Sequence, residues 1–457
     1  MDTFIINEKD NVCVNLETGH KIALVDIKKG ADIIKYGYSI GCATQNIKKG
    51  ESVHSHNMKT KLGDILSYEY NPNFSFPEKI QACEIMAFVR KNGDIGIRND
   101  IWIVPTVGCV NSIAKQLSEK TGAITCSHPY GCSQLGDDNK ITQLVLKGLI
   151  LHPNAGGVLV LGLGCENNNI AEMKKVLGET DGERIRFLSI QDCDDEIAEG
   201  IRIINELKEI ASSDKRVKVP VSALKVGLKC GGSDGFSGIT ANAVVGRVTD
   251  KLCSMGASAV LTEVPEMFGA ETVLFERCIN KDVFDKSVNL INDFKQYFKA
   301  HGQPVSENPS PGNKEGGITT LEEKSLGCVQ KGGRAPVVDV LDYGDTVRKQ
   351  GLSLLNGPGN DIVSLTNLTA AGCHMNLFTT GRGTPLGGMV PTVKIASNDM
   401  IAQKKKHWID FSAFSDDKDL KAQELFDLVC RVAEGEQTKN ELYGNREIAI
   451  FKDGVTL

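Results

Sequence analysis

Apolar and polar residues alternate in two short segments near the start of the chain, residues 21–25 and 32–36. A period of two places every second side chain on one face, which is typical of a half-buried β-strand. The tetrapeptide Ile-Lys-Lys-Gly at 27–30 returns at 47–50, and each copy ends in a glycine that allows a tight turn. We therefore predict a small all-β module in the first 70 residues.

Beyond residue 86 short apolar runs alternate with longer amphipathic segments. This alternation predicts βαβ units, in which helices cover a mostly parallel sheet, so the chain is assigned to the multidomain α/β class. Prolines interrupt the stretch 70–78, which we interpret as a linker. The predicted strands are 157–163, 185–190, 225–228, 257–261, 336–341, 362–365, 375–379 and 390–395. The predicted helices include 194–211, 240–255, 282–298 and 420–432.

The composition excludes several classes of protein. At ~100–200 residues per domain, 457 residues indicate more than one domain. Lys and Arg (52) against Asp and Glu (58) give a net charge of −6 without long blocks of one sign, so we expect no nucleic-acid or membrane partner. The longest apolar stretch, around 158–163, is far shorter than the ~18 residues of a membrane span. The first residues lack a basic, apolar secretion signal, so we expect a cytoplasmic protein.

Fourteen cysteines are scattered along the chain without a CxxC pair or a regular spacing. This pattern does not favour a disulfide scaffold. In a reducing compartment such thiols are core residues, metal ligands or reactive groups, and we expect most of them to belong to the core.

Two glycine-rich segments follow predicted strands, where ligands of parallel sheets usually bind. In the first, residues 229–242, Gly231, Gly232 and Ser233 precede a predicted helix, whose N-terminal amides favour an anion such as a carboxylate. In the second, Arg382 stands between two glycines, and its guanidinium can hold a carboxylate in a bidentate manner. The alternatives are a structural turn and a surface arginine.

Candidate metal ligands and acid–base groups occur in further loops. Cys165 and Glu166 follow a Gly-Leu-Gly turn that resembles the start of a dinucleotide fingerprint but does not continue it. His54 and His56 form a His-x-His pair, which on a strand directs both imidazoles to one face. Core packing and solvated surface histidines explain these patterns equally well.

The loops taken together resemble the altronate/galactarate dehydratase family, and the resemblance runs nearly end to end. The motifs that carry it are Ile-Lys-Tyr-Gly (34–37), Val-His-Ser-His-Asn (53–57), Pro-Thr-Val-Gly-Cys-Val-Asn (105–111), Tyr-Gly-Cys-Ser-Gln-Leu-Gly-Asp-Asp (130–138), His-Pro-Asn-Ala-Gly (152–156), Gly-Leu-Gly-Cys-Glu-Asn-Asn (162–168), Cys-Gly-Gly-Ser-Asp-Gly (230–235), Thr-Glu-Val-Pro-Glu-Met-Phe-Gly-Ala-Glu (262–271), Glu-Asn-Pro-Ser-Pro-Gly-Asn-Lys (307–314), Gly-Cys-His-Met (372–375) and Lys-Lys-Lys-His-Trp-Ile-Asp-Phe (404–411). One departure is the stretch between Asn11 and Lys21, where the first hairpin looks shorter than is usual in the family.

The resemblance implies a particular architecture. It implies an N-terminal β-clip module of the SAF type over residues 1–70 and a linker over 71–85. A second α/β domain associated with dimerisation would follow over 86–218, and a catalytic domain with a Rossmann-like parallel sheet flanked by helices over 219–457. We accordingly expect a homodimer.

The resemblance also implies a reaction, the loss of water from D-altronate to give 2-dehydro-3-deoxy-D-gluconate in hexuronate catabolism. It implies a divalent metal, typically ferrous iron, with Mn²⁺ or another divalent ion as the alternative. The expected metal ligands come from the set His54, His56, Cys132, Cys165, Glu166, Cys373 and His374. The expected acid and base come from Asp234, Lys314 and Glu315. The expected substrate-binding residues are Gly231, Gly232, Ser233, Arg382 and Thr384.

Other functions stay open at the level of the sequence. Within the same chemistry, a galactarate dehydratase or a sulfolactate lyase would share the fold and the loops. An NAD-dependent oxidoreductase is a different class that the sheet pattern and the Gly162-Leu163-Gly164 turn suggest. A non-catalytic sugar-acid-binding protein is a third class.

Overall fold

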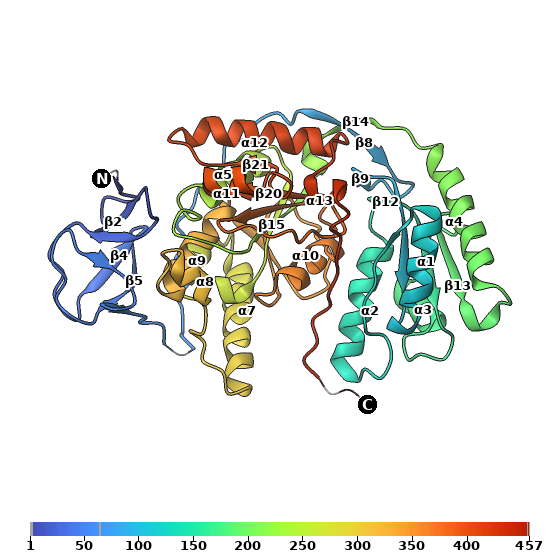
Figure 1. Cartoon of the computed structure of the whole chain (residues 1–457), viewed down its shortest axis with the longest axis horizontal. Helices are drawn as coiled ribbons and strands as arrows, with labels where there is room; N and C mark the ends of the chain where they lie inside the picture. The colour runs from blue at the N-terminus through green and yellow to red at the C-terminus, as the bar shows by residue number, and fades with distance from the viewer. Residues whose placement is uncertain (1–2, 64, 455, 457) are drawn as a thin grey trace.

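The computed structural model describes residues 3–63, 65–454 and 456, and it has three parts that follow one another along the chain. Figure 1 shows small antiparallel sheets at one end, a large sheet with many helices in the middle, and a smaller helix-covered sheet at the other end. No helix in this described part of the chain is long and apolar enough to span a bilayer.

The N-terminal part consists of short antiparallel strands, as the alternating pattern predicts. Gly30 and Gly50 each adopt a positive φ in the two Lys-Lys-Gly turns, and Ile27 pairs with Ile47, so the sequence repeat is also a structural repeat. One sheet contains β1 (Thr3–Phe4), β2 (Val12–Asn15), β3 (Lys21–Ala23) and β6 (Ser52–Val53). The other contains β4 (Asp32–Lys35), β5 (Tyr38–Ala43) and β7 (Met58–Lys59).

An extended connection leads from this part to the rest of the chain. The described residues between Thr60 and Cys83 form neither helix nor strand. The connection lies along the large middle part, because the Tyr70 hydroxyl donates a hydrogen bond to the Cys278 carbonyl (3.1 Å) and the Tyr68 ring packs edge-on against Phe275. It ends at a small antiparallel sheet made of β14 (Val217–Pro220), β8 (Glu84–Val89) and β9 (Ile95–Gly96).

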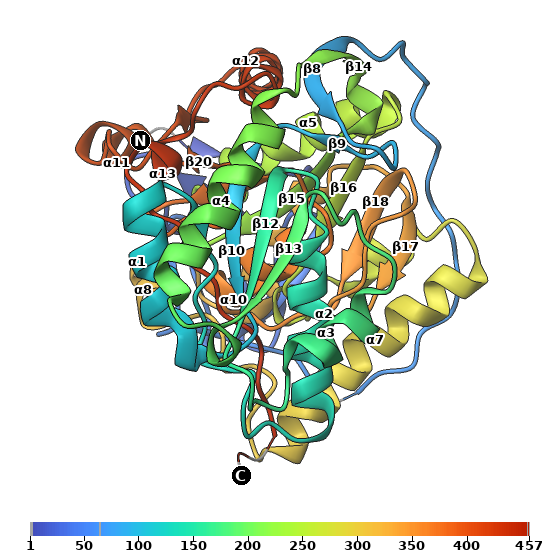
Figure 2. The same cartoon turned by 90° about the vertical axis from the view of Figure 1, so that its right-hand side faces the viewer.

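The smaller parallel sheet has helices on both faces (Figure 2). Apolar side chains alternate between the faces of its strands, so that Trp102 and Val104 pack under α2 and α3, whereas Ile101 and Ile103 pack under α1 and α4. The strand order is β11 (Ile124–Thr125), β10 (Asp100–Pro105), β12 (Ala155–Gly162) and β13 (Ile185–Ser189). The helices are η1 (Gly108–Val110), α1 (Asn111–Thr121), α2 (Gly136–Ile150), α3 (Ile170–Leu177), η2 (Ile190–Asp192) and α4 (Glu196–Ser212).

The large sheet is parallel throughout and forms the centre of the molecule. Its order is β17 (Val337–Leu341), β18 (Gly351–Leu355), β16 (Ser258–Leu261), β15 (Lys225–Cys230), β19 (Met375–Thr380), β20 (Thr392–Ala396) and β21 (Phe411–Ser412). The helices around it are η3 (Val221–Ala223), α5 (Ala241–Ser254), η4 (Val264–Glu266), α6 (Glu271–Phe275), α7 (Lys281–Ala300), α8 (Pro311–Glu315), α9 (Leu321–Cys328), η5 (Val329–Gly332), α10 (Asp361–Ala370), α11 (Asp399–Lys404), α12 (Lys418–Ala433) and α13 (Lys439–Leu442).

Helix α10 joins the two parallel sheets, because it packs against β15 of the large sheet and against α2 of the small one. A Cβ atom on Gly148 in α2 would lie 2.3 Å from the Ala370 carbonyl oxygen of α10, so the close approach of these helices requires glycine.

One predicted strand is wrong. Residues 362–365 belong to α10, which Asn360 caps by accepting a hydrogen bond from the Val363 amide (3.2 Å). The four residues Ile-Val-Ser-Leu are too few to distinguish a buried helix from a buried strand, and the capping residue Asn360 precedes them. The other predicted strands and helices correspond to elements of the structure.

Candidate active site

The glycine loop that follows β15 lies at the carboxyl edge of the large sheet. The Gly231 amide donates to the Thr379 carbonyl (3.0 Å), and the Gly232 carbonyl accepts from the Arg382 amide (3.0 Å). A Cβ on Gly231 would lie 2.5 Å from the Asp361 carboxylate, and Gly232 has a φ of 64°, so both positions favour glycine. The structure thus brings together the two glycine-rich segments that the sequence singles out.

Asp234 is buried at the outer end of this loop. Its Oδ1 accepts hydrogen bonds from the Ser237 amide (2.9 Å) and the Ser397 hydroxyl (2.9 Å), and its Oδ2 accepts one from the Asn398 side chain (3.0 Å). Burial raises the pKa of Asp234, although these hydrogen bonds act in the opposite direction. The carboxylate is therefore occupied in fixing the loop.

Helix α8 lies beside the loop and carries two of the predicted acid–base residues. Ser310 caps the helix, and the Asn313 side chain donates to the Ser233 carbonyl (2.8 Å). Arg382 Nη2 lies 3.1 Å from Glu315 Oε2, and both side chains are exposed. Exposed ion pairs are weak, so a substrate carboxylate can exchange with Glu315 at the guanidinium.

Thr384 follows Arg382 but is engaged locally. Its hydroxyl accepts a hydrogen bond from the Leu386 amide (3.2 Å), and its carbonyl accepts one from the Lys394 ammonium (2.9 Å).

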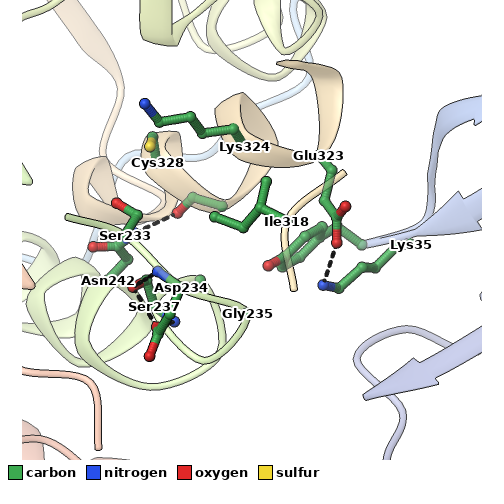
Figure 3. A pocket seen from close by; sticks show the side chains of 13 residues that line it. Lys35, Ser233, Asp234, Gly235, Ser237, Asn242, Ile318, Glu323, Lys324 and Cys328 are labelled. Atoms are coloured by element: carbon green, nitrogen blue, oxygen red, sulfur yellow. Dashed lines mark hydrogen bonds and ion pairs between the residues drawn. The ribbon is translucent and has the colours of Figure 1, made fainter. Parts of the chain in front are cut away.

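The N-terminal part closes over this edge through a buried ion network, part of which Figure 3 shows. Lys21 and Lys35 both contact the Glu323 carboxylate, at 2.7 and 2.8 Å. Burial lowers the pKa of Lys21 to about 8 against the opposing effect of Glu323. Burial opposes the ionisation of Glu323, but the two ammonium groups outweigh it and lower its pKa to about 2. Glu323 therefore stays ionised and holds the N-terminal part against α9.

His54 comes to the same region from the loop after β6. Its Nε2 lies 2.9 Å from the Lys314 carbonyl, which fixes Nε2–H as the donor in the neutral ring. Burial lowers the pKa of His54, so the imidazole is neutral at pH 7. The His20 ring lies 5.5 Å from the His54 ring, whereas the neighbouring His56 is exposed.

A second buried cluster lies at the inner end of the glycine loop. Cys230 Sγ is 3.4 Å from Cys328 Sγ and 3.1 Å from Glu266 Oε2. These three ligand atoms lie within 4.8 Å of one another and could hold a metal ion. The Lys331 ammonium lies 2.9 Å from Cys230 Sγ, and the Lys324 ammonium lies 3.1 Å from Glu266 Oε1. Two of the three possible ligands, Cys230 and Glu266, therefore each contact a lysine ammonium group.

The electrostatics of this cluster favour ionised donors. The hydrogen bond from Cys328 and the Lys331 ammonium lower the pKa of Cys230 to about 6, although burial acts against them. The same hydrogen bond and burial raise the pKa of Cys328 well above its ordinary value. Burial opposes the charge of Glu266, but Lys324 and other lysines outweigh it and lower the pKa of Glu266. The surroundings therefore favour the ionised forms of Cys230 and Glu266 and the thiol form of Cys328.

A further buried ion pair borders this cluster. Lys229 contacts Glu263 (2.6 Å) and Asp361 (2.7 Å). Glu263 has a φ of 69°, a left-handed conformation that a non-glycine residue adopts at a cost of about 1–3 kcal/mol. Such strain concentrates at functional sites, which supports a functional role for the loop after β16.

A small cavity lies between the glycine loop, α9 and β4. Its volume is about 10 Å³, which is comparable with one water molecule. Figure 3 shows α9, which carries Glu323, Lys324 and Cys328, next to Ser233 and Asp234 of the glycine loop. The residues that line it are Lys35, Tyr36, Ser233, Asp234, Gly235, Ser237, Gly238, Asn242, Ile318, Glu323, Lys324, Gly327 and Cys328.

The remaining predicted metal ligands lie elsewhere. His374 precedes β19 and accepts a hydrogen bond at Nδ1 from the Lys225 amide (3.0 Å), so it lies with Cys373 at the amino edge of the large sheet. Cys132, Cys165 and Glu166 lie at the carboxyl edge of the small sheet. The structure therefore divides the seven predicted ligands among three places.

The sequence analysis missed the Cys230, Glu266 and Cys328 cluster and the Lys21–Glu323 pair. Cys230 was visible at the end of a predicted strand next to the glycine loop, which was a usable signal. Glu266 and Cys328 lie 36 and 98 positions away from Cys230, and no local motif joins them.

The small N-terminal β-sheets and the two parallel sheets covered by helices define a multidomain α/β protein. Three family models match the chain: the altronate/galactarate dehydratase SAF domain over residues 8–61, the D-galactarate dehydratase/altronate hydrolase second domain over 87–212, and the D-galactarate/altronate dehydratase C-terminal model over 221–456. The chain belongs to the altronate/galactarate dehydratase family, as its motifs indicated.

Three curated relatives span nearly the whole chain. The altronate dehydratase of Bacillus subtilis (strain 168) is 53% identical over 97% of this chain and 93% of its own length. The altronate dehydratase of Escherichia coli (strain K12) is 52% identical over 98% of this chain and 94% of its own length. The galactarate dehydratase (L-threo-forming) of the same strain is 30% identical over 96% and 90%.

Proposed function

We propose that this protein removes water from D-altronate to give 2-dehydro-3-deoxy-D-gluconate. The observation that carries the choice of substrate is the identity of 52–53% to two altronate dehydratases over nearly the full length, against 30% to a galactarate dehydratase. The chemistry rests on the carboxyl edge of the large sheet, where Arg382 and His54 both contact α8 and where β15 ends in Cys230.

The proposal also covers the domains of the chain, its cellular location and its oligomeric state. A β-clip SAF domain would occupy residues 1–70, a linker 71–85, a dimerisation-associated domain 86–218, and a Rossmann-like catalytic domain 219–457. We propose a cytoplasmic homodimer. The three consecutive family matches support the order of the domains.

A divalent metal, most readily ferrous iron, fits Cys230, Glu266 and Cys328. Ferrous iron accepts sulfur and oxygen donors, and the pKa of Cys230 at about 6 makes a thiolate available at neutral pH. Cys373 and His374 face the amino edge, so we propose a structural role for them. When bound, the metal supplies positive charge beside the substrate carboxylate, where charge accumulates after loss of the C2 proton.

The protein residues divide the remaining work. Arg382 binds the substrate carboxylate in place of Glu315, and the backbone of Gly231, Gly232 and Ser233 lines the approach to the cluster. Asp234 positions this loop, because its oxygens are occupied by hydrogen bonds.

Two residues from opposite parts of the chain transfer the protons. The neutral His54 imidazole accepts the proton from C2, and the Lys314 ammonium protonates the departing 3-hydroxyl, which leaves as water. Glu315 is the alternative acid. Each transfer is worth ~10²–10⁴-fold in rate.

The test is an anaerobic assay of the purified chain with ferrous iron and a thiol reductant, in which 2-keto-3-deoxy acid is followed. D-altronate, galactarate and sulfolactate are supplied in parallel. We expect product from D-altronate at the highest kcat/KM. Product only from another acid would overturn the substrate, and altronate binding without turnover would support a non-catalytic binding protein. Reduction of NAD during turnover would favour an oxidoreductase.

A further inference from the structure

Three exposed cysteines gather at the carboxyl edge of the small parallel sheet. Cys109 lies in η1 after β10, Cys132 precedes α2, and Cys165 follows β12. Cysteine is among the residue types most often buried, and ten of the fourteen cysteines here are buried or half-buried. Three of the four exposed cysteines therefore share one edge of one sheet. This concentration indicates a role for the thiols outside core packing.

Backbone and side-chain hydrogen bonds tie the three loops together. The Gly108 amide donates to the Tyr130 carbonyl (2.8 Å), and the Asn168 amide donates to the Gly131 carbonyl (3.0 Å). The Ser133 amide donates to the Asn167 side chain (3.0 Å). Each of these contacts lies within three residues of one of the cysteines, so the thiols are held on adjoining loops.

The loops are also closely packed. A Cβ on Gly131 would lie 2.0 Å from the Thr106 carbonyl oxygen, so the loop of Cys132 can approach the loop of Cys109 only with glycine there. The buried Glu166 carboxylate accepts hydrogen bonds from the Thr106 hydroxyl (2.6 Å) and the amides of Leu163 (3.0 Å) and Gly164 (2.6 Å). Glu166 is thus engaged in shaping the loop of Cys165 and is not available as a metal ligand.

Two buried side-chain amides beside these loops each have one polar atom without a partner among the described residues. Gln134, 4% exposed, accepts from the Gly131 amide through Oε1 (3.0 Å), but its Nε2 has no acceptor. Asn168 is fully buried and its Oδ1 has no donor. A buried donor without an acceptor is costly, and sulfide or thiolate sulfur next to Gly131 would satisfy it.

We propose that Cys109, Cys132 and Cys165 bind a [4Fe–4S] cluster through three thiolates, which leaves one iron for a ligand other than cysteine. Thiolates select iron–sulfur clusters and other soft centres. A tetrahedral ion with bonds of about 2.3 Å to sulfur needs its sulfur atoms about 3.8 Å apart. Among the described residues these three sulfurs do not all lie within 4.8 Å of one another, so they are not arranged around a single ion.

This inference is independent of the proposed function, because iron at Cys230, Glu266 and Cys328 would carry no sulfide. The experiment compares the whole protein with its Cys109→Ser, Cys132→Ser and Cys165→Ser variants. Each is isolated without oxygen and supplied with iron, sulfide and a thiol reductant, and the excess is removed. Iron, acid-labile sulfide, visible absorption and electron paramagnetic resonance after reduction are then measured. The control is Cys83→Ser, which removes the fourth exposed cysteine.

We expect about four labile sulfide per chain in the wild type and in Cys83→Ser, with about four iron, or about five when the Cys230 site is also filled, and a visible charge-transfer band. Each of the three variants should lose most of the sulfide while its thermal unfolding midpoint stays within a few degrees of wild type. Wild-type protein with iron but no labile sulfide would overturn the proposal. Labile sulfide equal to wild type in the Cys109→Ser, Cys132→Ser and Cys165→Ser variants would also overturn it.

Discussion

The two parallel sheets both present cysteine at their carboxyl edges, but in opposite surroundings. At the large sheet Cys230 is 1% exposed and lies against Lys331, Cys328 and Glu266. At the small sheet Cys109, Cys132 and Cys165 are exposed. The topology of a parallel sheet supplies the position in both cases. The burial and the charge of the surroundings then decide which chemistry the thiol can perform.

Burial explains why the large sheet needs so many lysines. Ionised donors in a dry site are costly unless opposite charges compensate them, and Lys229, Lys324 and Lys331 supply that compensation. The exposed thiols of the small sheet need no such partners, and their positions depend on backbone hydrogen bonds. We therefore expect the large-sheet edge to respond to changes in charge. We expect the small-sheet edge to respond to changes at its thiols, such as ligand binding or substitution.

We expect the largest loss of stability from a substitution of Glu323, which holds the N-terminal part against the large-sheet edge. Glu323→Ala leaves Lys21 and Lys35 buried without a counter-charge, which should cost about 3–5 kcal/mol in the free energy of unfolding. Denaturant unfolding of the whole chain measures this. The control is Asp26→Asn, which breaks an exposed ion pair with Lys48 in the same part of the chain and should leave the midpoint unchanged. A small loss in Glu323→Ala would contradict the account of this network.

The same carboxylate should give a pH dependence. Its folded pKa of about 2 lies below the ordinary value of about 4.3, so its contribution to stability is present above pH 4.3 and is lost as the pH falls towards 2. Glu323→Gln removes this contribution. The difference in unfolding free energy between wild type and Glu323→Gln should therefore shrink over that window, and a constant difference would contradict the assignment.

Arg382 should show the next largest effect. Arg382→Ala removes charge-assisted hydrogen bonds to the substrate carboxylate, which are worth about 1.5–3 kcal/mol and correspond to a loss of ~10–100-fold in kcat/KM. The loss should fall mainly on KM, and Arg382→Lys should restore part of it. Steady-state kinetics decide the question, and an unchanged KM would remove Arg382 from the substrate site.

A smaller loss is expected for Asp234. Asp234→Asn keeps the shape of the side chain but disturbs its bonds to Ser237, Ser397 and Asn398, which should cost about 1–3 kcal/mol of stability. Turnover should fall by less than about tenfold, because a positioning residue takes no proton. A loss of ~10²–10⁴-fold with an intact fold would identify Asp234 as the acid or the base instead.

A further prediction concerns His54, whose loss as the base should lower kcat/KM by ~10²–10⁴-fold and change its pH profile. If neutral His54 is the base, kcat/KM rises with pH through a pKa below the ordinary value of about 6.5. His54→Gln can still donate to the Lys314 carbonyl but cannot accept the proton. Its profile should lack the acid limb, and a limb with the same midpoint in the variant would exclude His54 as the base.

Much of the fold was predictable, because periodicity is a local property. Strands such as β12, β15 and β19 are continuous apolar runs, and α7 is strongly amphipathic. The prediction at residues 362–365 was wrong because four residues are too few to show the period of a helix or a strand. The Asn360 cap starts a helix there despite the β-branched residues Ile362 and Val363. The strand β18 was missed because its five residues follow a predicted strand without a helical segment between them.

The candidate site was predictable only where it is local. The glycine loop and Arg382 both follow strands, and the structure brings them together. Lys21 and Glu323 are 302 positions apart, and charged residues of this kind are expected on the surface unless the fold pairs them. Their partnership depends on how the N-terminal part docks against α9, which no sequence motif encodes.

The most direct test of the account is the anaerobic dehydration of D-altronate by Cys230→Ser beside Cys278→Ser, which alters another buried cysteine of the same part of the chain. Both variants are first checked for wild-type thermal unfolding, and ferrous iron is supplied in excess. We predict that Cys230→Ser loses nearly all formation of 2-keto-3-deoxy acid, whereas Cys278→Ser retains it. Wild-type turnover in Cys230→Ser would contradict the location of the active site at the carboxyl edge of the large sheet.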